Sequence, residues 1–295
     1  MKFDQTYIAI RKRKLLEIVD LSFHVIRDYF APLSILWLLG VIPFMLLNWW
    51  LIGWMASDYY DGEMLFVYLY VSMMLVTVES HVATTFMTNY LGQAIFAQRP
   101  TIWNAVKSTC VTNPYFLIVH GLLRLVIPTV LLTLVLDSSM ERDSFVGLIL
   151  LMTLFATISN MTRFSRPFAS EILCLEKTPV WKKTGQINYG LRSSSLHQAA
   201  SSELIGRAFL VSVLAFPLTC TVTGVLLLLD YVFNLYTTAE FLPLIVYAPI
   251  AMWLVAGVFS VTRFLSYIDV RIRQEGWEVE LRLRAEALRL EKGGV

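Results

Sequence analysis

Six apolar stretches, each about 17 to 25 residues long, constrain this chain more than any other feature of its sequence. A helix of that length crosses the hydrocarbon core of a lipid bilayer. Hydrophobic residues make up 57% of the chain and charged residues only 16%, which is more apolar than a water-soluble domain. The sequence therefore predicts an all-α, polytopic membrane helix bundle with about six transmembrane helices. The stretches lie at 33–55, 64–86, 115–136, 145–161, 208–229 and 241–264.

The charges between these stretches set the expected orientation. The connections 57–63, 137–144 and 230–240 are acidic on balance, whereas most lysines and arginines lie in the amino-terminal arm, the central polar interval and the tail. Because basic loops stay on the cytoplasmic side of a membrane, both ends of the chain are expected in the cytoplasm. The prediction is a multi-pass protein of the bacterial inner (cytoplasmic) membrane.

The same pattern divides the chain into parts. Residues 1–30 combine a basic cluster with apolar residues three and four positions apart, which predicts an amphipathic helix in the headgroup layer or packed in the cytoplasm. Residues 31–264 form the six-span domain, with cytoplasmic segments 87–113 and 164–207 that also carry amphipathic helices. The last two apolar stretches hold almost no ionisable groups and are expected to face lipid.

The tail, residues 265–295, is rich in helix formers and predicts a cytoplasmic amphipathic helix. On a helical wheel it has two nearly opposite apolar stripes, one of which includes Trp277. Two stripes need two surfaces, so we expect burial against a partner, the membrane surface or the chain's own cytoplasmic segments. Alternation of apolar and polar residues from Trp277 to Leu283 leaves a strand open.

Four ionisable side chains are expected inside the membrane. Glu79 and His81 stand towards the inner end of the second stretch, and His120 and Arg124 share one face of the third. An unpaired charge at that depth costs on the order of 3 kcal/mol. We therefore expect Glu79 to face Arg124 or His120. The cluster is either a structural clasp between two helices or part of a proton, ion or substrate pathway.

Catalytic and metal-binding motifs are missing from the sequence. The four histidines lack the H-E-x-x-H spacing, so neither a metal site nor a cofactor is predicted. No G-x-S-x-G pattern surrounds the serines near His197, which is expected at the surface. The three cysteines show no C-x-x-C spacing, which is typical of reduced structural thiols. A net charge of +2 predicts no nucleic-acid partner.

A short motif follows the last apolar stretch. It reads Tyr-Ile-Asp-x-Arg-x-Arg-x-Glu-Gly and consists of Tyr267, Ile268, Asp269, Arg271, Arg273, Glu275 and Gly276. In this motif, and less closely in residues 166–179 (RPFASEILCLEKTP), the chain resembles an uncharacterised bacterial family of polytopic membrane proteins. That family is related to the non-catalytic membrane domain of glycerophosphodiester phosphodiesterases. The resemblance implies a membrane assembly with a MoxR-type ATPase and a transglutaminase-like membrane protein, and it supplies no catalytic residue.

The charges of the motif predict a contact with the central interval. Its arginines are expected to meet either phosphate headgroups or the carboxylates of Glu171 and Glu176. The candidates for this internal clamp, or for a partner surface, are Asp269, Arg271, Arg273, Glu275, Trp277, Glu171 and Glu176.

Two function classes follow from these features. The first is a non-enzymatic scaffold or assembly subunit of a membrane complex, which contacts membrane lipids and, through its cytoplasmic helices, protein partners or further copies of itself. The alternative is a transporter or lipid-handling protein that uses the intramembrane Glu79, His81, His120 and Arg124.

Overall fold

The computed structural model describes residues 14–53, 62–95, 100–116, 167–176, 178, 188–198, 200–233 and 242–274. Every regular element in these segments is a helix, which confirms the all-α prediction for this part of the chain. The helices are α1 (Leu15–Asp28), α2 (Phe30–Ile52), α3 (Gly62–Ala83), α4 (Thr85–Ala94), α5 (Ile102–Phe116), α8 (Ala169–Leu175), α9 (Tyr189–Gln198), α10 (Ser201–Phe233) and α11 (Leu242–Gln274).

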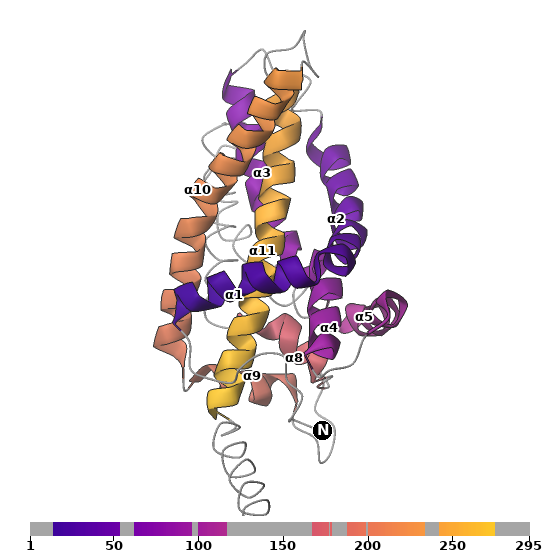
Figure 1. The fold of residues 1–295 in the computed structure, drawn as a ribbon, viewed down its shortest axis with the longest axis vertical. Helices are drawn as coiled ribbons and strands as arrows, with labels where there is room; N and C mark the ends of the chain where they lie inside the picture. The colour runs from indigo at the N-terminus through magenta and orange to yellow at the C-terminus, as the bar shows by residue number, and fades with distance from the viewer. Residues whose placement is uncertain are drawn as a thin grey trace, which may run out of the picture.

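Four helical stretches among the described residues are long and apolar enough to cross a membrane. They are α2, α3 continued by α4 (Leu65–Ala94), α10, and α11 from Pro243. Each exceeds the roughly 20 residues that a bilayer core requires, and Figure 1 shows all four running along the long axis of the molecule. The chain is therefore a membrane protein. The predicted stretches 115–136 and 145–161 lie almost wholly outside the described residues, so the count of six stays a prediction.

The second predicted span is one long path of two helices. α3 and α4 meet at Thr84, whose amide still donates to the carbonyl of Ser80 at 3.0 Å. Threonine hydroxyls return hydrogen bonds to the preceding turn at this point, from Thr84 to Ser80 and from Thr88 to Thr84. Such bonds bend helices without breaking them. The two helices therefore form one continuous path as far as Ala94, and α5 begins at Ile102.

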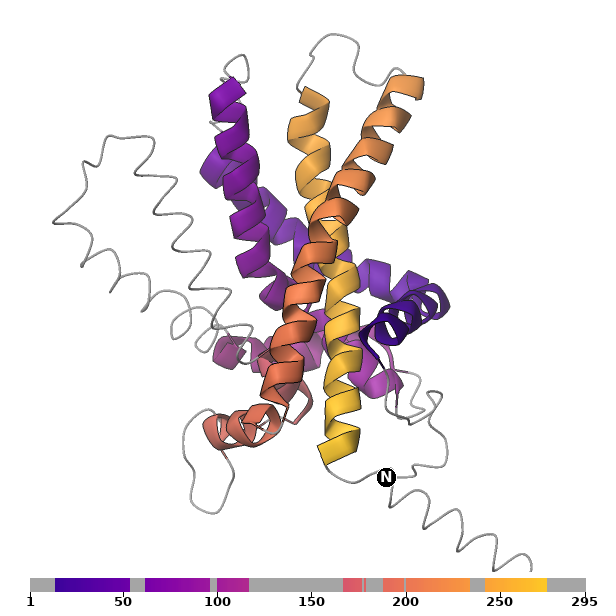
Figure 2. The same ribbon diagram turned by 90° about the vertical axis from the view of Figure 1, so that its left-hand side faces the viewer.

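α11 is the centre of the bundle. It packs against α10, α3 and α1, as the two orthogonal views show (Figures 1 and 2). Its Trp253, Phe264 and Tyr267 are among the largest fully buried side chains described. The expectation that this stretch faces lipid is wrong, because apolarity alone does not separate a helix surrounded by helices from one surrounded by lipid. α10, in contrast, exposes large apolar side chains such as Phe209 and Phe216.

Two glycines allow α2 to approach its neighbours closely. A Cβ atom at Gly40 of α2 would overlap the carbonyl oxygen of Ala83 on α3. A Cβ atom at Gly257 of α11 would lie 2.8 Å from Nε1 of Trp37, and that same Nε1 donates to the carbonyl of Trp253 at 3.2 Å. Small residues at such positions set the spacing of membrane helices.

α1 crosses the bundle nearly at right angles to the long helices (Figure 1). Ile18, Ser22 and Val25 are its buried residues, at the spacing that predicts an amphipathic helix. Ser22 Oγ accepts a hydrogen bond from Oγ1 of Thr262 on α11 at 3.1 Å. Within residues 1–30, only the part from Lys14 onward lies in the described segments.

Candidate functional site

Glu79 is held by an amide from the neighbouring helix. Nδ2 of Asn48 on α2 donates to Oε2 of Glu79 on α3 at 2.8 Å. Asn48 is 9% exposed, and its Oδ1 has no hydrogen-bond partner among the described residues. The partners expected from the sequence, His120 and Arg124, lie outside those residues. Asn48 was not predicted from the sequence as a partner of Glu79, although a single amide inside an apolar span indicates a hydrogen bond to a neighbouring helix.

His81 faces a different part of the bundle from Glu79. Two residues apart on a helix, the side chains do not share a face. Whereas Glu79 faces α2, His81 contacts Ser80 Oγ at 3.4 Å and lines a cavity on another side of α3. The side chains of Glu79 and His81 therefore lie on different sides of α3.

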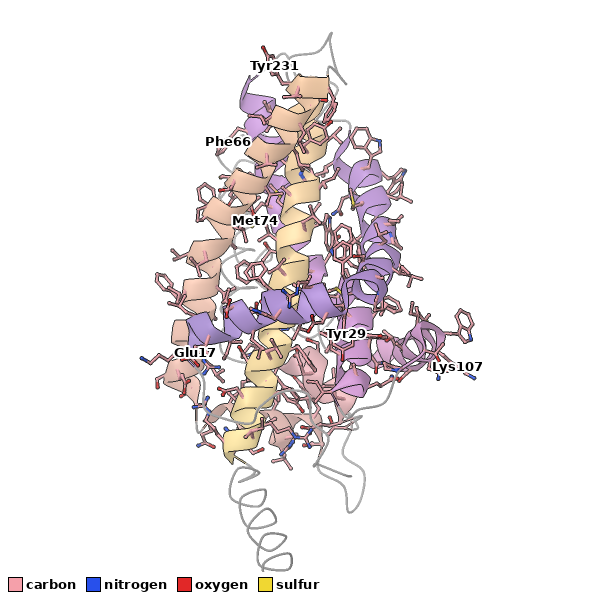
Figure 3. The ribbon with its side chains drawn as sticks, in the orientation of Figure 1. Glu17, Tyr29, Phe66, Met74, Lys107 and Tyr231 are labelled. Carbon is pink, nitrogen blue, oxygen red and sulfur yellow. The ribbon has the colours of Figure 1, made fainter. Side chains whose placement is uncertain are left out.

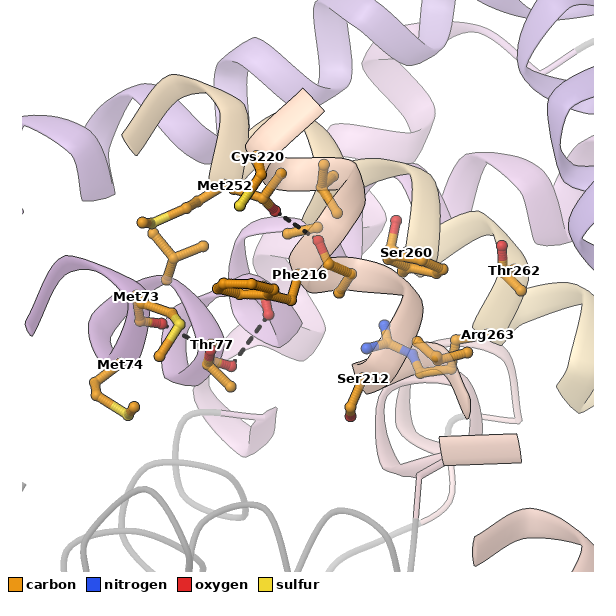
Figure 4. Close-up of a pocket in the computed structure, with 18 of the residues that line it drawn as sticks. Met73, Met74, Thr77, Ser212, Phe216, Cys220, Met252, Ser260, Thr262 and Arg263 are labelled. Carbon is orange, nitrogen blue, oxygen red and sulfur yellow. Dashed lines mark hydrogen bonds between the residues drawn. The ribbon is translucent and has the colours of Figure 1, made fainter. Parts of the chain in front are cut away.

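The cavity lies between α3, α10 and α11 and has a volume of about 920 Å³. We call it the groove. Its walls are mostly apolar. Phe66 and Leu244 line one end, and the other end is polar because Arg207 and Arg263 line it. Figure 4 shows Arg263 well separated from Met73 along the groove.

Charged side chains gather at the same end of the bundle as the two arginines. Four carboxylates and five arginines meet where α8, α9, α10 and α11 converge, and we call them the charge cluster. Its members are Glu171, Glu176, Arg192, Glu203, Arg207, Arg263, Asp269, Arg271 and Arg273.

One side of the charge cluster joins α11 to α10. Asp269, 3% exposed, accepts from Nη2 of Arg207 at 2.9 Å and contacts Nη2 of Arg273 at 3.1 Å. Nη1 of Arg273 lies 2.9 Å from Glu203, which also pairs with Arg207 at 2.6 Å. Asp269 and Arg273 are four residues apart, so they share the face of α11 that meets α10.

A second face of α11 meets α8. Residues 263, 267 and 271 are four apart and form one stripe. Arg263 Nε donates to Oε1 of Glu171 at 2.8 Å, and the hydroxyl of Tyr267 donates to Oε1 of Glu176 at 2.7 Å. Arg271 Nε lies 3.9 Å from Glu176. The structure thus brings Arg271 to Glu176, and it gives Glu171 to Arg263 instead of to Arg271.

Glu176 is the most heavily bonded carboxylate on this side. Burial favours its neutral form, but hydrogen bonds from Arg192 and Tyr267, together with the positive charges of Arg192 and Arg271, outweigh burial and lower the pKa of Glu176 below its ordinary value. Arg192 reaches it with two nitrogens, at 2.6 and 2.8 Å. This bidentate pair ties α9 to the end of α8.

Arg192, Arg207 and Arg263 were not predicted from the sequence as members of the cluster. The spacing of Arg263, Tyr267 and Arg271 was visible, but their partners lie about 90 residues away in sequence. Glu275 and Trp277, which the sequence also proposed, lie outside the described residues.

His197 is a buried structural residue of α9. It is 4% exposed and stacks on Phe168 with ring centroids 5.4 Å apart. Its Nδ1 donates to the carbonyl of Ser193 at 2.6 Å, and its Nε2 accepts from the amide of Phe168 at 3.4 Å. Both ring nitrogens are engaged, so the expectation of a surface histidine is wrong.

The chemistry open to these residues is limited. Within the described segments, no group of three or more His, Cys, Asp or Glu side chains could hold a metal ion. Burial raises the pKa of the Cys174 thiol to about 12, which makes this cysteine a poor nucleophile. Arginines bond each of the four cluster carboxylates, an arrangement that holds helices together.

Among known proteins, no family model, no curated protein and no solved structure matches the chain.

Proposed function

We propose that this chain is a non-enzymatic scaffold or assembly subunit of the bacterial inner membrane, with six spans and both ends in the cytoplasm. The charge cluster carries this proposal. A transport or catalytic carboxylate has to change its proton or its partner during a cycle. The cluster carboxylates are instead committed to arginines that join α8, α9, α10 and α11 into one platform.

The depth of α1 supports the proposed orientation. Thr262, where α1 contacts α11, lies about 20 residues, or about 30 Å, from the start of α11. That length equals the thickness of a bilayer core. In Figure 3, Glu17 of α1 and Lys107 of α5 lie towards the charge-cluster end, and Tyr231 lies at the opposite end. Tyr231 is 81% exposed, as expected of an interfacial aromatic residue.

This depth puts the parts of the molecule in distinct layers. α1 and α5 would lie in the inner headgroup layer, where the exposed Leu16, Phe23 and Trp103 suit the boundary with acyl chains. The charge cluster would lie beyond them, on the cytoplasmic side.

The proposed partner surface is the cytoplasmic end of the bundle. Leu191 of α9 is a large apolar side chain that is 61% exposed there. In the sequence, Glu275 and Trp277 follow directly after α11, which ends at Gln274. The partners implied by the resemblance, a MoxR-type ATPase and a transglutaminase-like membrane protein, are the candidates to bind it, together with further copies of the chain.

The alternative function is a transporter or lipid-handling protein built on Glu79, His81, His120 and Arg124. The Asn48–Glu79 bond favours it in one respect, because a polar pair inside apolar helices is costly to keep without a purpose. However, Glu79 faces α2, and the groove is on another side of α3. This geometry fits a clasp between α2 and α3 better than a pathway.

Purification from native membranes tests the proposal. The full-length chain, extracted in mild detergent, is expected to retain protein partners that mass spectrometry can identify. Leu191→Asp is expected to reduce their recovery severalfold, while Lys107→Asp, at an exposed site on α5, should not. Elution without any protein, combined with Glu79-dependent proton uptake in vesicles, would favour the transporter instead.

A further inference from the structure

We infer that the groove binds a glycerophospholipid with an anionic headgroup, its acyl chain between α3, α10 and α11 and its phosphate against Arg263. This inference goes beyond the scaffold function and does not depend on the identity of any protein partner.

The size and lining of the groove suit an acyl chain. Its volume of about 920 Å³ falls within the range of about 300–1,000 Å³ for small-molecule pockets. Leu244 and Arg263, which line its two ends, are about 19 residues or about 28 Å apart along α11. Met73, Phe216 and Met252 are among the apolar side chains between them (Figure 4). Methionine and phenylalanine provide an adaptable apolar wall of this kind.

Within the described segments, a buried donor of Arg263 lacks an acceptor at the polar end of the groove. Nε of Arg263 is used by Glu171, but its Nη2 is buried and has no hydrogen-bond partner among the described residues. A buried donor without an acceptor is unfavourable. A phosphate oxygen would satisfy it with a charge-assisted hydrogen bond, which is the strong kind.

The charge balance at this end also favours an anion. The charge cluster contains five arginines and four carboxylates, so one positive charge remains when all are ionised. Arg263 follows Thr262 directly, at the depth we propose for the inner headgroups. Anionic lipids of that leaflet attract such basic sites.

The two predicted spans outside the described residues do not offer an equivalent anion. Residues 117–166, which lie outside the described segments, contain three acids, Asp137, Glu141 and Asp143. The sequence predicts all three in the outer connection, at the membrane face opposite to the depth that we propose for Arg263. The apolar stretches 115–136 and 145–161 contain no acidic residue. They could fill the groove with hydrocarbon, but they bring no carboxylate to the arginine.

Two glycines of α10 provide a matched pair of variants. A Cβ atom at Gly224 or at Gly206 would meet no atom of the described residues within 4 Å. Only Gly224 is among the residues that line the groove. Gly224→Phe therefore fills the groove, while Gly206→Phe adds the same side chain elsewhere on the same helix. A third variant, Arg263→Gln with Glu171→Gln, removes the headgroup contact without leaving one buried charge alone.

The experiment measures lipid retention by the purified full-length chain. Phosphatidylglycerol and phosphatidylcholine with identical acyl chains are added to delipidated protein, and native mass spectrometry counts the bound lipid. Thermal unfolding checks that each variant is folded. The wild type and Gly206→Phe are expected to bind one phosphatidylglycerol with about tenfold preference. Gly224→Phe should lose both lipids, and the double glutamine variant should lose only the preference.

Three results would overturn the inference. The first is equal retention of the two lipids by the wild type. The second is an identical loss in Gly224→Phe and Gly206→Phe. The third is a wild type that binds neither lipid while Gly224→Phe alone destabilises it, which would assign the groove to an apolar stretch of this same chain. The comparison of Gly224→Phe with Gly206→Phe tests lipid binding in the groove even if the double glutamine variant does not fold.

Discussion

Nε of Arg263 on α11 lies 2.8 Å from Oε1 of Glu171 on α8, and the side chain of Glu171 has no exposed surface. Ser170 Oγ donates to the other carboxylate oxygen of Glu171 at 3.0 Å. The contact joins parts of the chain 92 residues apart. A buried pair of this kind is costly to break from one side, because the remaining charge has neither water nor a partner.

Arg263→Ala is expected to destabilise the folded chain by about 3–5 kcal/mol, because it leaves Glu171 buried and unpaired. Removing both charges, with Arg263→Met and Glu171→Leu, should cost much less than the sum of the two single changes. A double-mutant cycle on unfolding in detergent measures this coupling. Additive costs would show that the two side chains stabilise the fold independently.

Stability is expected to fall in acid through Glu176. The pKa of this carboxyl is lower in the folded chain than its ordinary value of 4.5. Its contribution is therefore fully present above about pH 4.5 and is lost as the pH falls through the lower folded value. Thermal unfolding between about pH 3 and pH 7 checks this. Glu176→Gln should make the acid side of the profile shallower, because it removes one carboxyl whose pKa is lowered in the folded chain.

Gly40→Ala is expected to destabilise the chain by about 1–3 kcal/mol, because its methyl group overlaps the carbonyl of Ala83. Gly206→Ala is the matched control, since open space surrounds its Cβ position. Alanine favours a helix over glycine, so this control should gain up to about 1 kcal/mol. A gain at both sites would mean that α2 and α3 are not in close contact.

The Asn48–Glu79 bond predicts a structural clasp. Asn48→Leu should destabilise the chain by about 1–3 kcal/mol, because it leaves a buried carboxyl group without its donor. Adding Glu79→Met should recover most of that loss. If the double variant regains its stability but no longer retains protein partners or supports cell function, the role of this pair is not purely structural.

The proposed orientation predicts the outcome of thiol labelling. In a cysteine-free background, Tyr231→Cys should react with a membrane-impermeant maleimide added to intact spheroplasts. Lys107→Cys should react only after the membrane is made permeable. Both side chains are exposed in the structure, so burial does not limit either reaction. The reverse pattern would invert the proposed topology.

The long helices were predictable because their apolar length alone determines them. The end of α11 was less predictable. The sequence predicted a boundary at residue 265, just after the first charged residue of the last apolar stretch, Arg263, but α11 continues to Gln274. It continues because Asp269 and Arg273 find partners on α10 while Tyr267 and Arg271 find them on α8. Charges end a span in a sequence, but they do not end a helix.

Pairings between distant residues were predictable only in kind. The sequence indicated that arginines after the last span would meet carboxylates of the central interval, but residue spacing could not say that Arg263 takes Glu171. Asn48 and His197 show the same limit. Each is a polar residue whose role depends on a neighbouring helix, from which the sequence separates it by 29 residues or more.

The hydrogen bond between Ser22 and Thr262 has a consequence for folding during synthesis of the protein. The two residues are 240 positions apart, so at 5–20 residues per second a ribosome needs roughly 10–50 s to supply the second after the first. Throughout that interval the inner face of α1 has no α11 to rest on. α1 must therefore remain without this partner until α11 is made, and a chain cut short before α11 would never form the contact.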